Sequence, residues 1–97
     1  MIDAGDIHLA DLNEEVRRRV LVLSKNRFNV AAGRVVVAPE FLGEVDEVAF
    51  PWRVHIEGAV YAVDLVRSIP TDRLLERVDR APAAAMARVR RALLHIT

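Results

Sequence analysis

The sequence predicts a mainly β protein, a compact β-barrel or curled sheet with helices, the last of them a C-terminal helix packed on it. Two observations support this class. The first two thirds of the 97 residues hold short apolar runs separated by turn residues, as strands do. Beyond Pro70 the apolar residues recur every three or four positions, which is typical of helices. No linker or repeat interrupts the chain, so we expect a single domain over residues 1–97.

The expected strands follow one another along the chain. The first alternates apolar and polar residues, as a strand exposed on one face does. The second and third are continuous β-branched or aliphatic runs, which favours burial on both faces. The fourth alternates again with Trp52 on its apolar side, and Gly58 turns it into the fifth. These strands are expected at residues 6–12, 20–23, 35–38, 52–57 and 59–66.

Three helical segments are expected. The stretch SKNRFNVAAG predicts a turn of helix that ends at its glycine. Thr71 or Asp72 caps a short helix that runs through Leu75, and Pro82 opens a longer one. In the longer helix, Arg88, Arg91 and His95 are expected to face away from the core. Its buried face is predicted from apolar residues at helical spacing, namely Met86, Val89, Leu93 and Ile96.

Composition excludes several function classes. The chain has no cysteine, which excludes disulfides and thiolate metal sites. His8, His55 and His95 lack the paired spacing of a metal motif, so we expect neither a metal nor a cofactor. No apolar run approaches the ~18 residues of a membrane span, and residues 1–4 do not open a signal peptide. We therefore expect a soluble, cytoplasmic protein without a membrane partner.

The formal net charge is zero, but one segment is purely basic. Residues 17–34 contain six basic side chains and no acidic one, and they begin with three consecutive arginines set against the apolar run 20–23. An anionic partner such as RNA would find direct charge-assisted contacts there. The alternative is that the charges flank buried strands and serve solubility. The six residues are Arg17, Arg18, Arg19, Lys25, Arg27 and Arg34.

The order of motifs resembles one known family. GDIHLADLN is followed by RRRVLVLSKNRFN, GRVVVAP and VDLVRSI, and then by DRLLERVDRAPAAAMARVRRAL. In this order and spacing they resemble the MazF/PemK toxins of bacterial toxin–antitoxin pairs, along nearly the whole chain. The positions that match the family pattern are Gly5, Asp6, Arg18, Ser24, Asn29, Gly33, Pro39, Asp64, Val66 and Arg67.

The resemblance implies a small SH3-like β-barrel that forms a homodimer. It also implies a metal-independent endoribonuclease that cuts single-stranded RNA at short sequences and is silenced by a cognate antitoxin. Such an enzyme uses the RNA's own 2′-hydroxyl as nucleophile, so the protein must supply a base, an acid and positive charge for the phosphorane. Arg18 falls on the family's catalytic arginine. A guanidinium suits this role because its planar fork grips two phosphate oxygens and stays charged.

The sequence departs from the family where a catalytic threonine is expected. That position holds Phe41, which has no proton to exchange, and Leu65 stands where the family prefers glutamine. Three interpretations remain open. Glu40 or Glu15 serves as the base; Phe41 is a stacking platform for a nucleobase rather than part of the core or dimer interface; or the protein binds RNA without cutting it.

The candidate site therefore has two parts. The proposed catalytic residues are Arg18, Glu40 and Glu15, and the proposed RNA-binding residues are Arg17, Arg19, Lys25, Arg27, Phe41 and His55. His8, which replaces a tryptophan usual in the family, is expected to hydrogen-bond a neighbour rather than do chemistry. The arginines of the last helix are interpreted as a solvated face, with antitoxin contact as the alternative.

A second function class is a CcdB-like toxin, which shares the fold and traps DNA gyrase. Its activity depends on a C-terminal Trp-Gly-Ile, whereas this sequence reads Leu94-His95-Ile96-Thr97, which argues against gyrase trapping. We expect a homodimer, because a chain this short and this apolar would otherwise expose a sizeable patch. We also expect the antitoxin to bind through a disordered, partly acidic segment that offsets the basic block. The RNA sequence that is recognised and the identity of the antitoxin do not follow from the residues.

Overall fold

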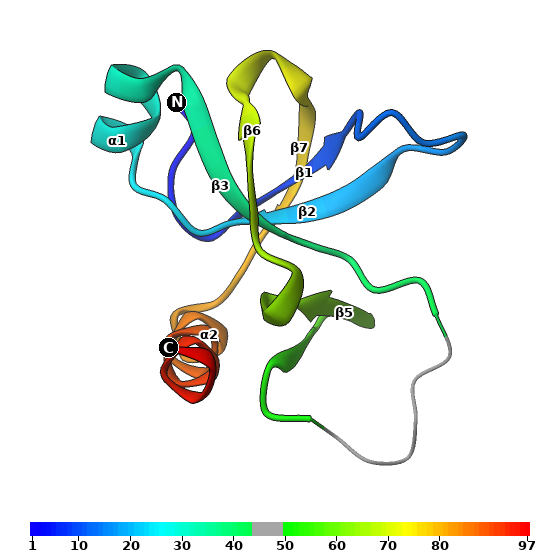
Figure 1. Cartoon of the computed structure of the whole chain (residues 1–97), viewed down its shortest axis with the longest axis vertical. Coiled ribbons are helices and arrows are strands. Elements are labelled where there is room, and N and C mark those ends of the chain that lie inside the picture. Colours follow the sequence, from blue (N-terminus) through cyan, green and yellow to red (C-terminus); the bar gives the residue numbers. More distant parts are fainter. Residues whose placement is uncertain (44–49) are drawn as a thin grey trace.

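A five-stranded antiparallel sheet, strongly curled, forms the centre of the molecule (Figure 1). The computed structural model describes residues 1–43 and 50–97. The strand order in the sheet is β6-β3-β2-β1-β7, and β4 pairs with β5 in a separate hairpin. The strands are β1 Asp6–Ala10, β2 Arg18–Val22, β3 Arg34–Pro39, β4 Arg53–Ile56, β5 Ala59–Ala62, β6 Arg67–Pro70 and β7 Leu74–Arg80. The helices are α1 Asn26–Ala32 and α2 Ala83–Ile96, and the short 3₁₀ turns are η1 Val63–Leu65 and η2 Thr71–Arg73.

The two edges of the curled sheet are linked at one end. The edge strands β6 and β7 are consecutive in the chain and are joined only by the turn η2, seen in yellow in Figure 1. The chain thus closes the sheet at one end, although no hydrogen-bonded ladder joins β6 to β7 in the described residues. The predicted mainly β, barrel-like class with a C-terminal helix is confirmed.

Two predicted elements are wrong in detail. The strand expected over residues 59–66 ends at Ala62, and the 3₁₀ turn η1 then redirects the chain into β6. The helix expected to run through Leu75 is only the turn η2, and the chain continues as the strand β7. Every residue of β7 after Leu74 is exposed, so its sequence carries no alternating pattern. Backbone pairing with β1 holds it in place, and this tertiary effect overrides local propensity.

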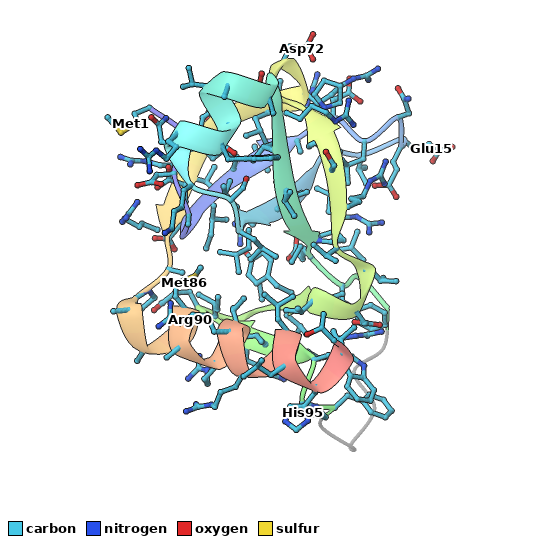
Figure 2. The ribbon with its side chains drawn as sticks, turned by 60° about the vertical axis from the view of Figure 1, so that its left-hand side comes forward. Met1, Glu15, Asp72, Met86, Arg90 and His95 are labelled. Carbon is cyan, nitrogen blue, oxygen red and sulfur yellow. The ribbon has the colours of Figure 1, made fainter. Side chains whose placement is uncertain are left out.

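The central strand β2 is buried on both faces, as its continuous apolar run predicts. Val20, Leu21 and Val22 each have 0% of their surface exposed. Val20 and Val22 pack inside the curl of the sheet, whereas Leu21 faces the opposite layer. That layer consists of α2 and the β4–β5 hairpin, which lie together on one side of the sheet (Figures 1 and 2).

The helix α2 covers this side with small apolar residues. Ala85, Val89 and Ala92 are buried, and Met86 and Leu93 pack at the border of the same core. In Figure 2 the labelled Met86 lies on the side of α2 nearest the sheet and His95 at its far end. The predicted buried face is therefore confirmed for Val89, Met86 and Leu93 and wrong for Ile96, which is 44% exposed because the helix runs beyond the core.

A hydrogen-bond network anchors α1 between β2 and β3. The buried Asn29 side chain donates to the carbonyls of Ile2 and Ser24 and accepts from the Ser24 hydroxyl, which in turn accepts from the N–H of Val36. Asp3 accepts from the N–H of Asn26, and this bond is the main reason why the pKa of the Asp3 carboxyl is lowered. The two family-pattern positions Ser24 and Asn29 thus have structural roles.

Asn29→Ala removes three hydrogen bonds at once and leaves buried polar groups unsatisfied. We expect the free energy of unfolding to fall by about 2–3 kcal/mol, measured by urea denaturation. Val30→Ala, in the same helix but 75% exposed, is the matched control and should be nearly neutral. Equal stability of the two variants would contradict the anchoring role of Asn29.

Candidate functional site

The three consecutive arginines do not share one direction. Successive residues of a strand point to opposite faces, and Arg18 and Arg19 are the first two residues of β2. Arg18 is paired across the sheet with Ala10, and Arg19 with Leu9. Arg18 therefore lies on the face that forms the inside of the curl, and Arg19 lies on the face covered by the hairpin. Arg17 precedes the strand and is exposed.

Arg18 forms an ion pair with a residue that the sequence analysis did not select. Its Nη2 lies 2.6 Å from Oε2 of Glu14, and its side chain is only 22% exposed. The Nε atom of Arg18 is buried and has no hydrogen-bond partner among the described residues. Glu14 lies on the bend 13–16, which begins at Asn13, whose φ is +61°. The site thus combines a carboxylate with a guanidinium that keeps an unsatisfied donor.

Glu15, the predicted base, is placed differently. It lies at the tip of the β1–β2 connection, where its side chain points outward (Figure 2). Within the described residues it makes no ion pair, whereas its neighbour Glu14 does. The only signal in the sequence for Glu14 is its separation of four residues from Arg18, which is a contact distance in a helical turn.

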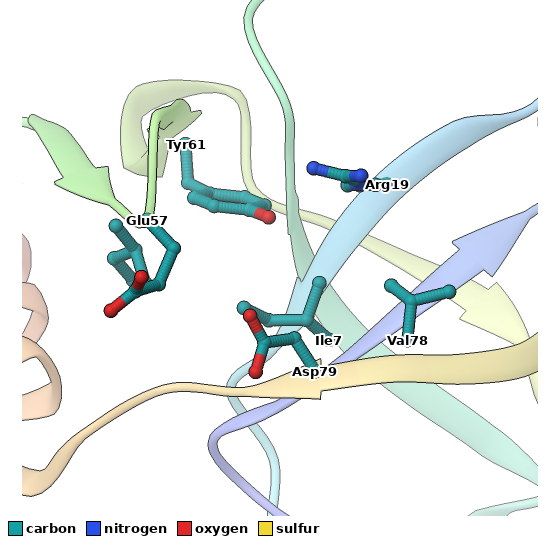
Figure 3. Close-up of a pocket in the computed structure, with 7 residues that line it drawn as sticks. Ile7, Arg19, Glu57, Tyr61, Val78 and Asp79 are labelled. Carbon is teal, nitrogen blue, oxygen red and sulfur yellow. The ribbon is translucent and has the colours of Figure 1, made fainter.

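Arg19 lines a small cavity with Ile7, Tyr61 and Asp79 (Figure 3). The cavity measures about 60 Å³, room for a few water molecules but not for a nucleotide. Figure 3 shows the Tyr61 hydroxyl directed towards Arg19. Burial raises the pKa of Tyr61 to about 12, with a further rise from the charge of Glu40 and an opposing effect of Arg19. Tyr61 therefore stays a neutral phenol.

Glu40 stands opposite Arg19 rather than Arg18. Its N–H donates to the Arg19 carbonyl over 2.9 Å, and it forms an isolated bridge with Tyr61, where the sheet passes into the β4–β5 hairpin. The alternation of side chains therefore puts Glu40 on the hairpin side. The structure does not bring the two predicted catalytic residues Arg18 and Glu40 together on one face within a single chain.

Phe41 already has a partner for its ring. The guanidinium carbon of Arg53 lies 4.0 Å from the ring centroid, a cation–π contact. Two hydrogen bonds to Asp64, of 2.8 and 3.1 Å, fix Arg53 in this place. The backbone of Gly43 also approaches the ring closely. One face of Phe41 is thus covered, and a nucleobase that stacked there would have to displace Arg53.

The remaining candidates are spread over the molecule. Lys25 and Arg27 lie at α1, beyond the opposite end of β2 from Arg18, roughly 15 Å away for a strand of this length. His55 is exposed on β4, and Arg88 of α2 donates to its carbonyl oxygen. His8 is bonded through Nδ1 to the carbonyl of Leu75 at 3.0 Å, which confirms the expected hydrogen bond to a neighbour.

Two classes of site are not found in the described part of the chain. His, Asp and Glu residues in the ranges 1–43 and 50–97 form no group of three that could hold a metal ion. No helix in those ranges is both long and apolar enough to cross a membrane.

Solved structures share this fold over nearly the full chain. An endoribonuclease in complex with its cognate antitoxin from a mycobacterial species has a TM-score of 0.84 and 18% identity, covering 98% of this chain and 93% of that one. A MazE–MazF complex from Deinococcus radiodurans (form II) has a TM-score of 0.82, 26% identity and the same coverage. Form I of that complex has a TM-score of 0.77 and 30% identity over 98% of this chain and 94% of that one.

The curled sheet with its hairpin and C-terminal helix is therefore the MazF fold. Residues 3–97 match the family described as the PemK-like, MazF-like toxin of type II toxin–antitoxin systems. The chain belongs to this toxin family, and the resemblance seen in its motifs is confirmed. A comparison with curated protein sequences gives no match.

The raised pKa of Tyr61 predicts how stability depends on pH. The folded protein holds the phenol proton more tightly than the unfolded chain, whose tyrosine has a pKa of about 10. The stabilisation is therefore complete below pH about 10 and is lost as the pH rises towards 12. Tyr61 is the only tyrosine, so tyrosinate absorbance reports it alone. A folded-state midpoint near 10, or the same alkaline loss of stability in Tyr61→Phe, would contradict this assignment.

Proposed function

We propose that the protein is an endoribonuclease toxin that cuts single-stranded RNA next to Arg18. The main observation behind the proposal is the ion pair formed by Glu14 and Arg18, the first residue of β2. Membership of the toxin family and the likeness to a mycobacterial endoribonuclease support it. We further propose that it acts in the cytoplasm.

In the proposed reaction, Glu14 takes the proton of a 2′-hydroxyl, whose oxygen attacks the adjacent phosphorus. The bond from phosphorus to the 5′-oxygen breaks, which leaves a 2′,3′-cyclic phosphate, and the 5′-oxygen takes a proton from solvent. The guanidinium of Arg18 neutralises the charge that gathers on the phosphoryl oxygens. The Arg18 side chain is 22% exposed, so part of it is open to a phosphate group.

Glu14 replaces Glu15 and Glu40 as the proposed base for geometric reasons. A general base must lie within hydrogen-bond reach of the reacting group that the arginine holds. Glu14 touches Arg18, whereas Glu40 lies on the face of Arg19 and Glu15 points into solvent. The ion pair also keeps Glu14 in place before RNA binds.

A second candidate function is RNA binding without cleavage. Phe41 favours it, because the position of the family's threonine offers a ring packed against Arg53 instead of a hydroxyl. Both candidates need a cognate antitoxin, and relatives solved as complexes with antitoxins support such a partner. We propose that an acidic, disordered antitoxin segment covers the basic side chains that follow Asn13.

We also propose that two copies form a homodimer. Several large apolar side chains are exposed, and two of them, Leu75 and Val78, belong to the edge strand β7. An edge strand with exposed apolar residues is a natural site for association. A dimer would also bring basic residues of two chains to one RNA.

The cleavage test compares two neighbouring carboxylates. Arg18→Ala and Glu14→Gln should each lower the rate constant for cutting a mixed-sequence RNA by about 10²- to 10⁴-fold. Glu15→Gln, on the same bend, is the matched control and should cut at nearly the normal rate. All reactions contain EDTA, and the products are tested for cyclic phosphate ends.

Two outcomes would count against this assignment, and a further variant explains the second. If Glu15→Gln loses activity and Glu14→Gln does not, the base is misassigned. If the unaltered protein binds RNA and leaves every phosphodiester intact, the non-cleaving candidate is correct. If Phe41→Thr then restores cutting, the missing hydroxyl is the reason.

The oligomeric state is tested by light scattering at tens of micromolar protein. We expect the mass of two chains, since one chain has 10.9 kDa. Val78→Glu should shift the protein towards one chain, because it puts a charge into the apolar edge, while Val30→Glu on α1 should not. A monomeric unaltered protein would contradict the dimer.

A further inference from the structure

A basic groove lies beside η2, the turn that joins the two edge strands of the curled sheet. It is lined by three arginines, Arg34, Arg67 and Arg73, together with Asp11, Asn13 and Ser68. Its volume is about 180 Å³. The groove lies between β6 with its turn η2 and the segment that follows β1. In Figure 1, β6 is yellow-green and η2 is the yellow turn at the top centre, and the segment after β1 is blue at the upper right.

Two of the guanidinium groups are held in fixed orientations. Arg34 donates from Nε to the Ser68 hydroxyl over 2.8 Å and from Nη2 to the Ser68 carbonyl over 2.9 Å. Arg73 donates from Nη1 to the side-chain oxygen of Asn13 over 3.0 Å. These bonds use one edge of each guanidinium and leave further N–H groups for a ligand.

The charges in the groove are unbalanced. Among the described residues that line the groove, Asp11 is the only acidic one, and it lies 3.7 Å from Arg73. Arg67 is exposed and makes no ion pair within residues 1–43 and 50–97. Three like charges close together disfavour one another unless an anion joins them. A phosphate group fits this chemistry, since a guanidinium binds two of its oxygens at once.

We propose that this groove binds a backbone phosphate of the RNA strand, apart from the phosphate that is cut. The proposal rests on the proposed function, because it extends the strand that Arg18 holds. The groove and the Arg18 site share one segment of chain. Asp11 and Asn13 line the groove, and Glu14, next along that segment, pairs with Arg18.

RNA fits the groove better than an acidic peptide does. A bound peptide gains most of its affinity from apolar anchors in pockets. Two of the three apolar residues that line the groove are turned into the core, since Ile69 is 3% exposed and Leu12 packs against the same cluster, and the third, Pro70, is a small exposed ring. What remains accessible is mostly polar and cationic, which is what a phosphate backbone needs.

The test is the affinity of Arg67→Gln for a single-stranded RNA of mixed sequence. Arg67 makes no ion pair in the described residues, so its loss should leave folding intact. We expect the Kd to rise roughly tenfold at low salt, which is the effect of losing one charge-assisted contact. The slope of log Kd against log salt should fall by about 0.7, the value for one phosphate of a single strand. In cleavage assays KM should rise while kcat stays unchanged.

Arg73→Gln is a second variant with the same expected result, and Arg90→Gln on the exposed side of α2 is the control. The subsite is overturned if both groove variants bind RNA with the affinity and salt slope of the unaltered protein. It is also overturned if they weaken the binding of a glutamate-rich peptide but not of RNA. If the unaltered protein binds no RNA at all, the proposed function fails together with the subsite, and this outcome is distinct from the other two.

Discussion

Burial of β2 on both faces is the constraint on which the rest of the fold depends. A chain of 97 residues has few residues with which to cover both faces of one strand. It covers one side by curling the sheet around Val20 and Val22, and the other by placing α2 and the β4–β5 hairpin over Leu21. Neither of these two layers covers the first residues of β2, because the charged side chains there cannot enter the core.

This constraint also sets the chemistry of the arginine run. Because side chains alternate along a strand, Arg18 lies on the inner face of the curled sheet and Arg19 lies on the face towards Tyr61. Two adjacent, identical side chains thus have unlike surroundings, one facing a carboxylate and the other a buried phenol. The residue at the position of the family's threonine is Phe41, which contacts the β4–β5 hairpin. Its ring packs against the guanidinium of Arg53 on β4, and Asp64 compensates the charge of Arg53.

The sequence predicted those elements whose buried apolar residues recur at a regular spacing. β2, β3 and the buried face of α2 were expected because their apolar residues repeat at the spacing of their structure. β7 was missed because it is exposed almost throughout and depends on its pairing with β1. The choice between Glu14 and Glu15 needed the backbone of the bend after Asn13, which no local pattern specifies. Likewise, the groove of Arg34, Arg67 and Arg73 joins residues far apart in sequence, so only the folded sheet reveals it.

The turn η2 has a consequence for the newly made chain. β7 pairs with the outer side of β1, and the helix α2, which covers β2, follows β7 in the chain. The first half of the chain therefore completes neither face of its central strand β2. Pairing across such long sequence separation forms late, after the loop entropy has been overcome. During translation the sheet therefore stays open until β7 and α2 have left the ribosome. The strand that carries Arg18 thus obtains the residues that complete its two faces only after they are made, well after the strand itself.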